Sequence, residues 1–350
     1  KDNEGDEIQT IRVVNELEKN PAVKAIIGPI SETNAIIAAN SLQGKNIPLL
    51  IPSATLDGIT SLGNNIYQLN SNLSVRGKIA ARYITKILEL DSIAVLAPAD
   101  NFGHALTDAF VKEVDQLGKK IVGVEWYSGI PTDLKRQFKN LRKIAFDLKE
   151  KDNNYDEYLG MVLDSLDFLF ELSDDDLFDI PDDEDEKLTA LDSSKLKLNT
   201  IQAIYSPAHP DHLAYIGTQF PMYYFETQIV GNDSWKNLDV LNQSNIGPHM
   251  EGLIIISNNY SIDIKDQIYN QAFDCTQLIY SIVNDQNNGR LALAKKLSNL
   301  SDFSGESHNV RFFDSNLNTS LQVLRYENNQ ITRSGYFVGD SLLSLESIAP

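Results

Sequence analysis

The chain has 350 residues, of which 42% are hydrophobic and 23% are charged, so it is long enough for two globular domains with sizeable cores. The formal net charge of −19 argues against nucleic acids and anionic membrane surfaces as partners. No apolar run reaches the roughly 18–20 residues that a membrane span needs.

The N-terminal segment predicts a turn followed by an amphipathic helix that ends near Pro21. Apolar residues recur in it at helical spacing, so we expect them on one buried side. They are Ile8, Ile11, Val14 and Leu17.

The stretch 24–60 predicts a strand, a turn, a helix, a second strand and a polar loop. Its apolar runs at 25–27 and 47–51 are typical of parallel strands buried on both faces. Ser31 is placed to cap the intervening helix, and Gly44 to end it with a positive φ.

Small hydroxyl side chains follow these strands and open this helix: Ser31, Ser53 and Thr55. In open α/β sheets, ligands bind outside the carboxyl ends of the strands. Free backbone N–H groups and hydroxyls there suit an anionic group such as a carboxylate. The alternative is that these hydroxyls only cap helices and close turns.

Strands and helices then alternate, which indicates parallel βαβ units and an α/β fold. Strands are expected at 64–72, 93–96, 121–126, 200–205, 229–231 and 253–257. Helices are expected at 75–90, 105–117, 133–144, 268–283 and 291–300, with a further one that ends at Phe220. The tail from 310 to 337 alternates apolar and polar residues between turn signals, which predicts antiparallel strands.

An acidic insert is expected at 151–199. Between Asp152 and Asp192 there are sixteen acidic residues and one lysine. A solvated loop is the expected structure. The alternatives are a docking site for a basic partner and a calcium site, although the order of residues does not fit the helix-loop-helix calcium pattern.

No catalytic pattern stands out, because the chain has no nucleophile elbow, phosphate loop, dinucleotide fingerprint or zinc-protease motif. The single cysteine, Cys275, lies in an apolar segment and is expected to be a buried thiol. His209 and His212, with Asp211 between them, could hold a metal ion; a helix cap and a surface histidine are the other interpretation. We expect no enzyme activity, cofactor or metal.

Three segments carry a resemblance to a known family: 28–60 (GPISETNAII…), 93–141 (IAVLAPADNFGH…) and 217–235 (…QIVGNDSW). They resemble type I periplasmic binding proteins of the leucine/isoleucine/valine-receptor group. Those are substrate-binding proteins of ABC transporters, with penicillin-binding-protein activators as relatives.

The resemblance implies two doubly wound parallel-sheet lobes joined by three hinge crossings. Lobe 1 would comprise 1–70 and 257–310; lobe 2 would comprise 71–256 and 311–350, with the acidic insert inside it. The strand, helix and strand that begin the family's first lobe are expected to be missing here. Either the sequence begins inside that lobe, or another segment takes the place of the first strand.

The resemblance also implies a ligand site between the lobes. Four residues match the elements that bind a ligand carboxylate, and Asp233 matches the acidic residue that binds an ammonium group. Phe102 stands where the family usually has tyrosine, so the site would keep an aromatic wall but lack the tyrosine hydroxyl. Ala208 and His209 replace an aromatic wall of the second lobe. The four carboxylate-site matches are Ser31, Ser53, Ala54 and Thr55.

These features predict an extracytoplasmic or periplasmic protein that captures an amino acid or similar carboxylate by hinge closure, for transport or sensing. Its partner would be a membrane permease or an envelope protein, and a lipid anchor could be carried on a segment outside this sequence. The alternative is a cell-envelope scaffold or regulator with the same fold and a degenerate cleft.

Overall fold

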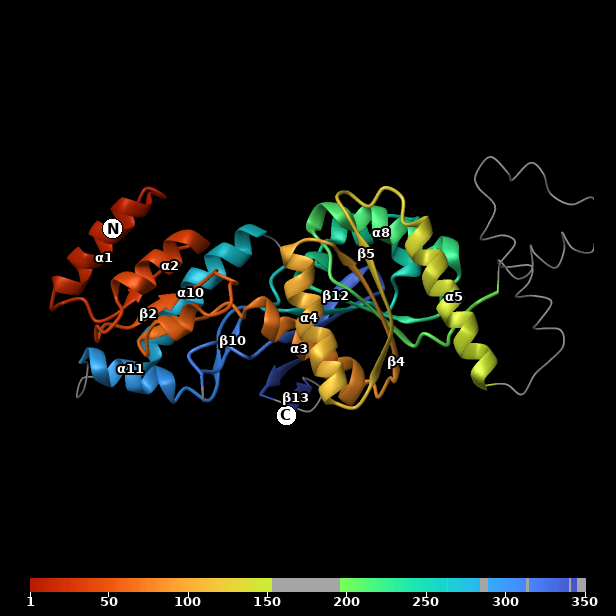
Figure 1. The fold of residues 1–350 in the computed structure, drawn as a ribbon. Coiled ribbons are helices and arrows are strands. Elements are labelled where there is room, and N and C mark those ends of the chain that lie inside the picture. Colours follow the sequence, from red (N-terminus) through yellow and green to blue (C-terminus); the bar gives the residue numbers. More distant parts are fainter. Residues whose placement is uncertain (153–195, 263, 284–288, 313–314, 340, 345–350) are drawn as a thin grey trace, which may run out of the picture.

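The computed structural model describes residues 1–152, 196–262, 264–283, 289–312, 315–339 and 341–344. The chain forms two lobes, one on a three-stranded sheet and one on an eight-stranded sheet (Figure 1). Most of the predicted acidic insert, residues 153–195, lies outside the described residues.

Lobe 1 is a parallel sheet in the order β1-β2-β3 between two helical layers. Successive side chains of a strand point to opposite faces. Leu49 therefore packs beneath α1 and α2, and Leu50 beneath α10 and α11. The elements of this lobe are α1 (Glu7–Lys19), β1 (Ile26–Ile27), α2 (Glu32–Ser41), β2 (Leu49–Ile51), β3 (Ile66–Gln68), α10 (Ile264–Ile282), α11 (Arg290–Ser298), β9 (Phe303–Ser304) and β10 (Asn309–Val310).

Lobe 2 is a mixed sheet in the order β13-β12-β11-β8-β7-β6-β4-β5. Its strands β4 to β8 are parallel and β11 to β13 are antiparallel. Val95 faces the core beneath α3 and α4, and Leu96 the core beneath α5 and α8. The elements are α3 (Leu73–Arg82), β4 (Ser92–Pro98), α4 (Asn101–Gln116), β5 (Lys120–Tyr127), α5 (Lys135–Asp152), β6 (Ala203–Ser206), α8 (Leu213–Gln219), β7 (Gln228–Gly231), α9 (Leu238–Leu241), β8 (Ile254–Ser257), β11 (Gln322–Glu327), β12 (Gln330–Val338) and β13 (Ser341–Ser344).

The predicted alternation of strands and helices and the antiparallel tail are confirmed. Gly44 follows α2 with φ +72°, and the thiol of Cys275 is buried. Helix α1 differs from the prediction because it buries Thr10, Val13 and Val14. Ile8 and Ile11 are 61% and 42% exposed, so the face that packs on lobe 1 is rotated from the one that the apolar spacing indicated.

We infer from the order of the elements that the chain passes between the lobes at 69–72, 257–259 and 318–320. Ser71 ties them together: its N–H donates to Asn258 Oδ1 at 2.9 Å, and its hydroxyl donates to the Asn318 carbonyl at 2.7 Å. Phe312, beyond the predicted boundary at 310, packs against Tyr67 in lobe 1. We therefore propose 318–320 as the third crossing, in place of 310–311.

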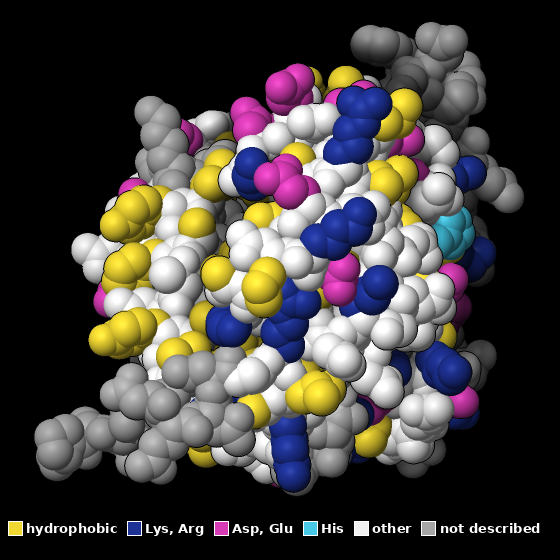
Figure 2. Space-filling view, turned by 90° about the vertical axis from the view of Figure 1, so that its left-hand side faces the viewer, with side chains coloured by type: hydrophobic (Ala, Val, Ile, Leu, Met, Phe, Trp, Pro, Cys, Tyr) yellow, Lys and Arg dark blue, Asp and Glu magenta, His cyan; other side chains and the backbone are white. Residues whose placement is uncertain are grey.

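Helix α10 exposes several large apolar side chains. Ile268, Tyr269 and Tyr280 are 56%, 69% and 78% exposed, and Tyr269 stacks on Phe273. Figure 2, which faces lobe 1, shows hydrophobic side chains gathered along one margin of this surface. Among the described residues, no helix combines the length and the apolar character needed to cross a membrane.

Replacing Gly77 with alanine tests how closely α3 and α4 pack. A Cβ at this position would lie 2.3 Å from the Leu106 carbonyl oxygen, which belongs to the backbone of α4. We expect a loss of about 1–3 kcal/mol in the free energy of unfolding, although alanine favours helices by about 1 kcal/mol. Urea denaturation measures the loss.

The matched control is Gly289→Ala, because no heavy atom lies within 4 Å of a Cβ there. Because Gly289 is the N-cap of α11, where alanine is less favourable than glycine, we expect a loss of about 0.5–1 kcal/mol, without the clash at Gly77. Equal stabilities of the two variants would show that a methyl group at position 77 fits between α3 and α4 without a clash.

Candidate ligand-binding cleft

Parallel strands of both lobes end beside the passages between the lobes. Ser53 follows β2 in lobe 1, and Asp233 follows β7 in lobe 2. The chain Ser53–Asn70–Arg76–Asp233 connects these two strand ends by hydrogen bonds. The predicted site residues therefore fall into two groups, one on each lobe, and this chain of hydrogen bonds links Ser53 of the first group to Asp233 of the second.

The lobe 1 group forms a compact polar rim. Ser53 Oγ donates to the Ile30 carbonyl at 2.5 Å. Thr55 donates through its N–H at 2.8 Å and its hydroxyl at 3.0 Å to one oxygen of Glu32. The N–H of Leu56 donates to the same oxygen at 3.0 Å. Thr55, one of the four residues assigned to a ligand carboxylate, thus has both of its donors engaged by a carboxylate of the chain.

The remaining predicted residues of lobe 1 lie close by. Ser31 occupies the N-cap position of α2, as expected, but its side chain makes no capping hydrogen bond. Ala54 is buried, and its carbonyl accepts a hydrogen bond from Gln68 Nε2 at 2.8 Å.

An aromatic wall stands at the edge of lobe 2. The rings of Phe102 and His209 are 4.6 Å apart between centroids, and His209 Nε2 lies 2.7 Å from Asp100 Oδ2. Burial alone would raise the pKa of Asp100, but the Gly103 N–H and His209 lower it below its ordinary value. Ala208 is buried behind this wall. The structure therefore brings together Phe102, Ala208 and His209.

The two predicted histidines have separate partners. His212 is buried, not on the surface, and its Nδ1 lies 3.2 Å from the Tyr127 hydroxyl. Burial lowers the pKa of His212. Within the described ranges, no group of three His, Cys, Asp or Glu side chains is arranged to hold a metal ion.

Asp233 is bonded to groups from three segments of the chain. It forms an ion pair with Arg76, and it accepts hydrogen bonds from Ser257 Oγ at 2.5 Å and Asn258 N–H at 3.0 Å. Burial would raise the pKa of this carboxyl, but Arg76 and Lys236 hold it below its ordinary value. The residue expected to bind a ligand ammonium is thus neutralised by cations of the chain.

Lys236 is the second of these cations. Its ammonium lies 3.8 Å from Asp233 Oδ1 and donates to Asn259 Oδ1 at 2.8 Å, with only 2% of its side chain exposed. Burial lowers its pKa to about 8, against the opposing effect of Asp233.

Sequence reasoning missed Glu32, Arg76, Asn70 and Lys236. One signal was present for Arg76, which lies in the first turn of α3. A cation there opposes the helix dipole, and this indicates a nearby counter-charge. Glu32 gave no such signal, because an acidic residue is ordinary in a first turn.

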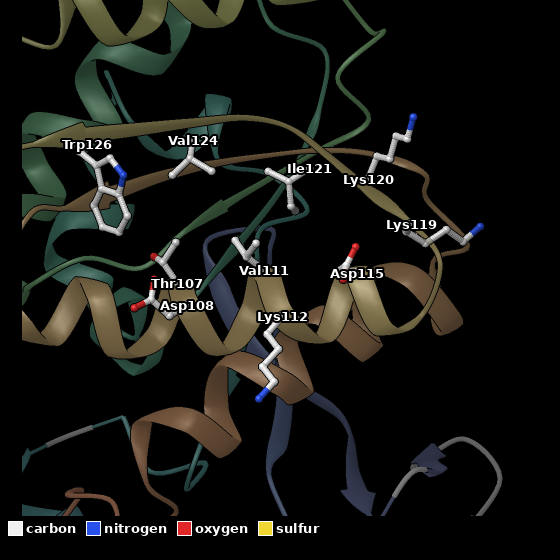
Figure 3. A pocket seen from close by; sticks show the side chains of 10 residues that line it. All are labelled: Thr107, Asp108, Val111, Lys112, Asp115, Lys119, Lys120, Ile121, Val124 and Trp126. Atoms are coloured by element: carbon white, nitrogen blue, oxygen red, sulfur yellow. The ribbon is translucent and has the colours of Figure 1, made fainter.

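A separate hollow of about 650 Å³ lies between α4 and the edge strand β5 (Figure 3). Val111, Ile121 and Val124 belong to its apolar lining, and Lys112, Lys119 and Lys120 also line it, with their ammonium groups directed outward (Figure 3). None of the predicted site residues lines it.

Comparisons with known proteins agree with this architecture. Residues 1–145 match the model of a family described as periplasmic binding protein, which confirms the resemblance seen in the sequence. The "Amino acid binding protein" of Pseudomonas aeruginosa is 25% identical over 115 residues, which are 33% of this chain and 31% of that protein. The "Leucine-, isoleucine-, valine-, threonine-, and alanine-binding protein" of the same organism is 24% identical over 136 residues, 39% of this chain and 36% of that protein. The matched segments thus span about a third of these curated relatives.

A solved structure matches nearly the whole chain. It is a putative branched-chain amino acid ABC transporter protein from Rhodospirillum rubrum, with a TM-score of 0.71 at 13% identity, covering 95% of this chain and 86% of that one. The similarity shows that the two-lobed α/β fold is shared.

The substitution Asp233→Ala tests the charge network at the hinge. It would leave Arg76 and Lys236 without their shared counter-ion, so we expect a loss of about 3–5 kcal/mol in the free energy of unfolding. Asp108→Ala, an exposed position on α4, is the control and should stay within about 0.5 kcal/mol of the parent. Equal losses at both positions would exclude Asp233 as the centre of the network.

The pKa of Lys236 predicts how stability depends on pH. Because the pKa is about 8 in the folded chain and 10.5 ordinarily, the unfolded chain binds more protons between these values. Stability attributable to this group therefore rises with pH in that window. From about pH 8 to about pH 9.5, the parent should gain stability relative to Lys236→Met in urea titrations. Parallel pH profiles would contradict the lowered pKa.

Proposed function

We propose that this chain is an extracytoplasmic solute-binding protein that captures a small molecule between its lobes by hinge closure. The observation that carries the proposal is that the loops after β2 of lobe 1 and β7 of lobe 2 are linked by the chain Ser53–Asn70–Arg76–Asp233. Asn232, on the second of these loops, also accepts a hydrogen bond from the N–H of Ala208, which adjoins the aromatic wall. Short polar passages join the lobes, which is the arrangement that permits closure about a ligand.

The rim and the wall offer apolar contacts to a hydrocarbon group. Ile30, on the loop after β1, and Leu56, on the loop after β2 that carries Ser53 and Thr55, are 68% and 41% exposed. Phe102, on lobe 2, is half-buried. Relatives named for binding leucine, isoleucine and valine make a solute of that size the first class to test.

Closure of the lobes would be the change that a partner protein detects. A ligand that contacts both lobes binds the closed form better than the open form and shifts the population toward it. A membrane permease or an envelope protein would then recognise the closed shape. The role is binding, without chemistry on the solute.

A non-transport scaffold of the cell envelope is the second candidate. The ion pair of Asp233 with Arg76 favours it, because the expected ammonium position is filled without a ligand. A scaffold would keep the fold and a partner surface and would bind no solute.

A thermal-shift screen of amino acids, amides, carboxylates and sugars tests the proposed function. A solute at about 100 times its dissociation constant should add roughly 2.7 kcal/mol of stability. Small-angle scattering should show a smaller radius of gyration with the same solute, because the lobes close.

The variant Phe102→Ala should weaken binding of any solute found, by about 10-fold or more for a lost aromatic wall. Tyr269→Ala, on the outer side of lobe 1, is the matched control and should leave the affinity unchanged. If no solute stabilises the folded protein in the screen, the solute-binding function is rejected and the scaffold function remains.

A further inference from the structure

Glu32 places a carboxylate where the rim of lobe 1 would receive one from a ligand. Three donors converge on its Oε1: the Thr55 N–H at 2.8 Å, the Thr55 hydroxyl at 3.0 Å and the Leu56 N–H at 3.0 Å. All of them lie just beyond the carboxyl end of β2, where an α/β sheet presents its ligand groups.

An external carboxylate would have to compete with this internal one. Glu32 is the first residue of α2, and a short tether holds its carboxylate near the donors at an effective concentration in the millimolar range or above. Hydrogen bonds to a charged acceptor are stronger than neutral ones, so each lost contact counts against displacement.

The residue expected to bind a ligand ammonium group, Asp233, also has a partner within the chain. Asp233 is paired with Arg76, and the guanidinium of Arg76 also donates to the Ser71 carbonyl at 3.0 Å and to Asn70 Oδ1 at 2.5 Å. A free amino acid would have to break contacts at both of its charged ends. An uncharged solute would break none of them.

We propose that Glu32 determines the specificity of the cleft by excluding carboxylates, so that the cleft takes uncharged solutes with a hydrocarbon body. The choice of ligand class rests on the proposed function; the exclusion by Glu32 does not. Ile30, Leu56 and Phe102 supply the apolar contacts, and Glu32 and Arg76 keep the charged positions closed.

Calorimetry with two matched probes tests this. Isovalerate and isovaleramide share a hydrocarbon body and differ in charge. The parent protein should bind isovaleramide at least about tenfold more tightly than isovalerate. Glu32→Ala frees the donors of Thr55 and Leu56, so isovalerate should bind it at least about tenfold more tightly than it binds the parent.

The variant Glu32→Gln tests whether exclusion depends on the hydrogen bonds of residue 32 or on its negative charge. Its amide oxygen can accept the same hydrogen bonds, so it should exclude isovalerate as the parent does. A gain confined to Glu32→Ala is not expected if the residue only supports the fold. In the parent, the amide signals of Thr55 and Leu56 should not move when isovalerate is added, a measurement that needs no variant.

Two results would overturn the inference: saturable shifts of those amides in the parent, or a folded Glu32→Ala protein that gains no affinity for isovalerate. A parent that binds neither probe and fails the wider screen, while Glu32→Ala gains isovalerate, would instead reject the solute-binding function and keep Glu32 as the internal occupant.

Discussion

The ion pair between Arg76 and Asp233 is the contact on which the arrangement of the hinge depends. It joins the start of α3, directly after the first passage, to the end of β7. A buried charge without a partner costs several kcal/mol, so each member requires the other to stay in place. Ser257 and Asn258 of the second passage bond the same carboxylate, which ties two of the three passages to one group.

The position of this network follows from the sheets. Right-handed βαβ units place the carboxyl ends of parallel strands at one edge, and both lobes are built from such units around the hinge. Side chains of each central strand enter both helical layers, so the strands are fixed from two sides. The loops that follow β2, β4, β6 and β7 are therefore held by rigid strands, although they are irregular themselves.

Much of this could be predicted from the sequence, because apolar runs and helix caps are local signals. The strand at 93–96 and the placement of Ser53 and Asp233 at strand ends are of this kind. The partners of those residues are tertiary facts: Glu32 reaches Thr55 across 23 positions and Arg76 reaches Asp233 across 157. The buried side of α1 was misjudged for a related reason, since spacing cannot say which of two adjacent apolar stripes meets the sheet.

Internal saturation of the charged groups changes what can drive closure. In a cleft with free donors and a free carboxylate, a zwitterionic ligand supplies the missing charges and thereby joins the lobes. Here the Glu32 contacts and the Arg76–Asp233 pair already satisfy those groups in the absence of any solute. If the lobes close about a solute, as proposed, the free energy of closure would come from apolar surface, at roughly 25 cal/mol per Å² removed from water. Ile30 and Leu56 on one lobe and Phe102 on the other carry that surface, so the hydrocarbon body of a ligand would decide whether the lobes close.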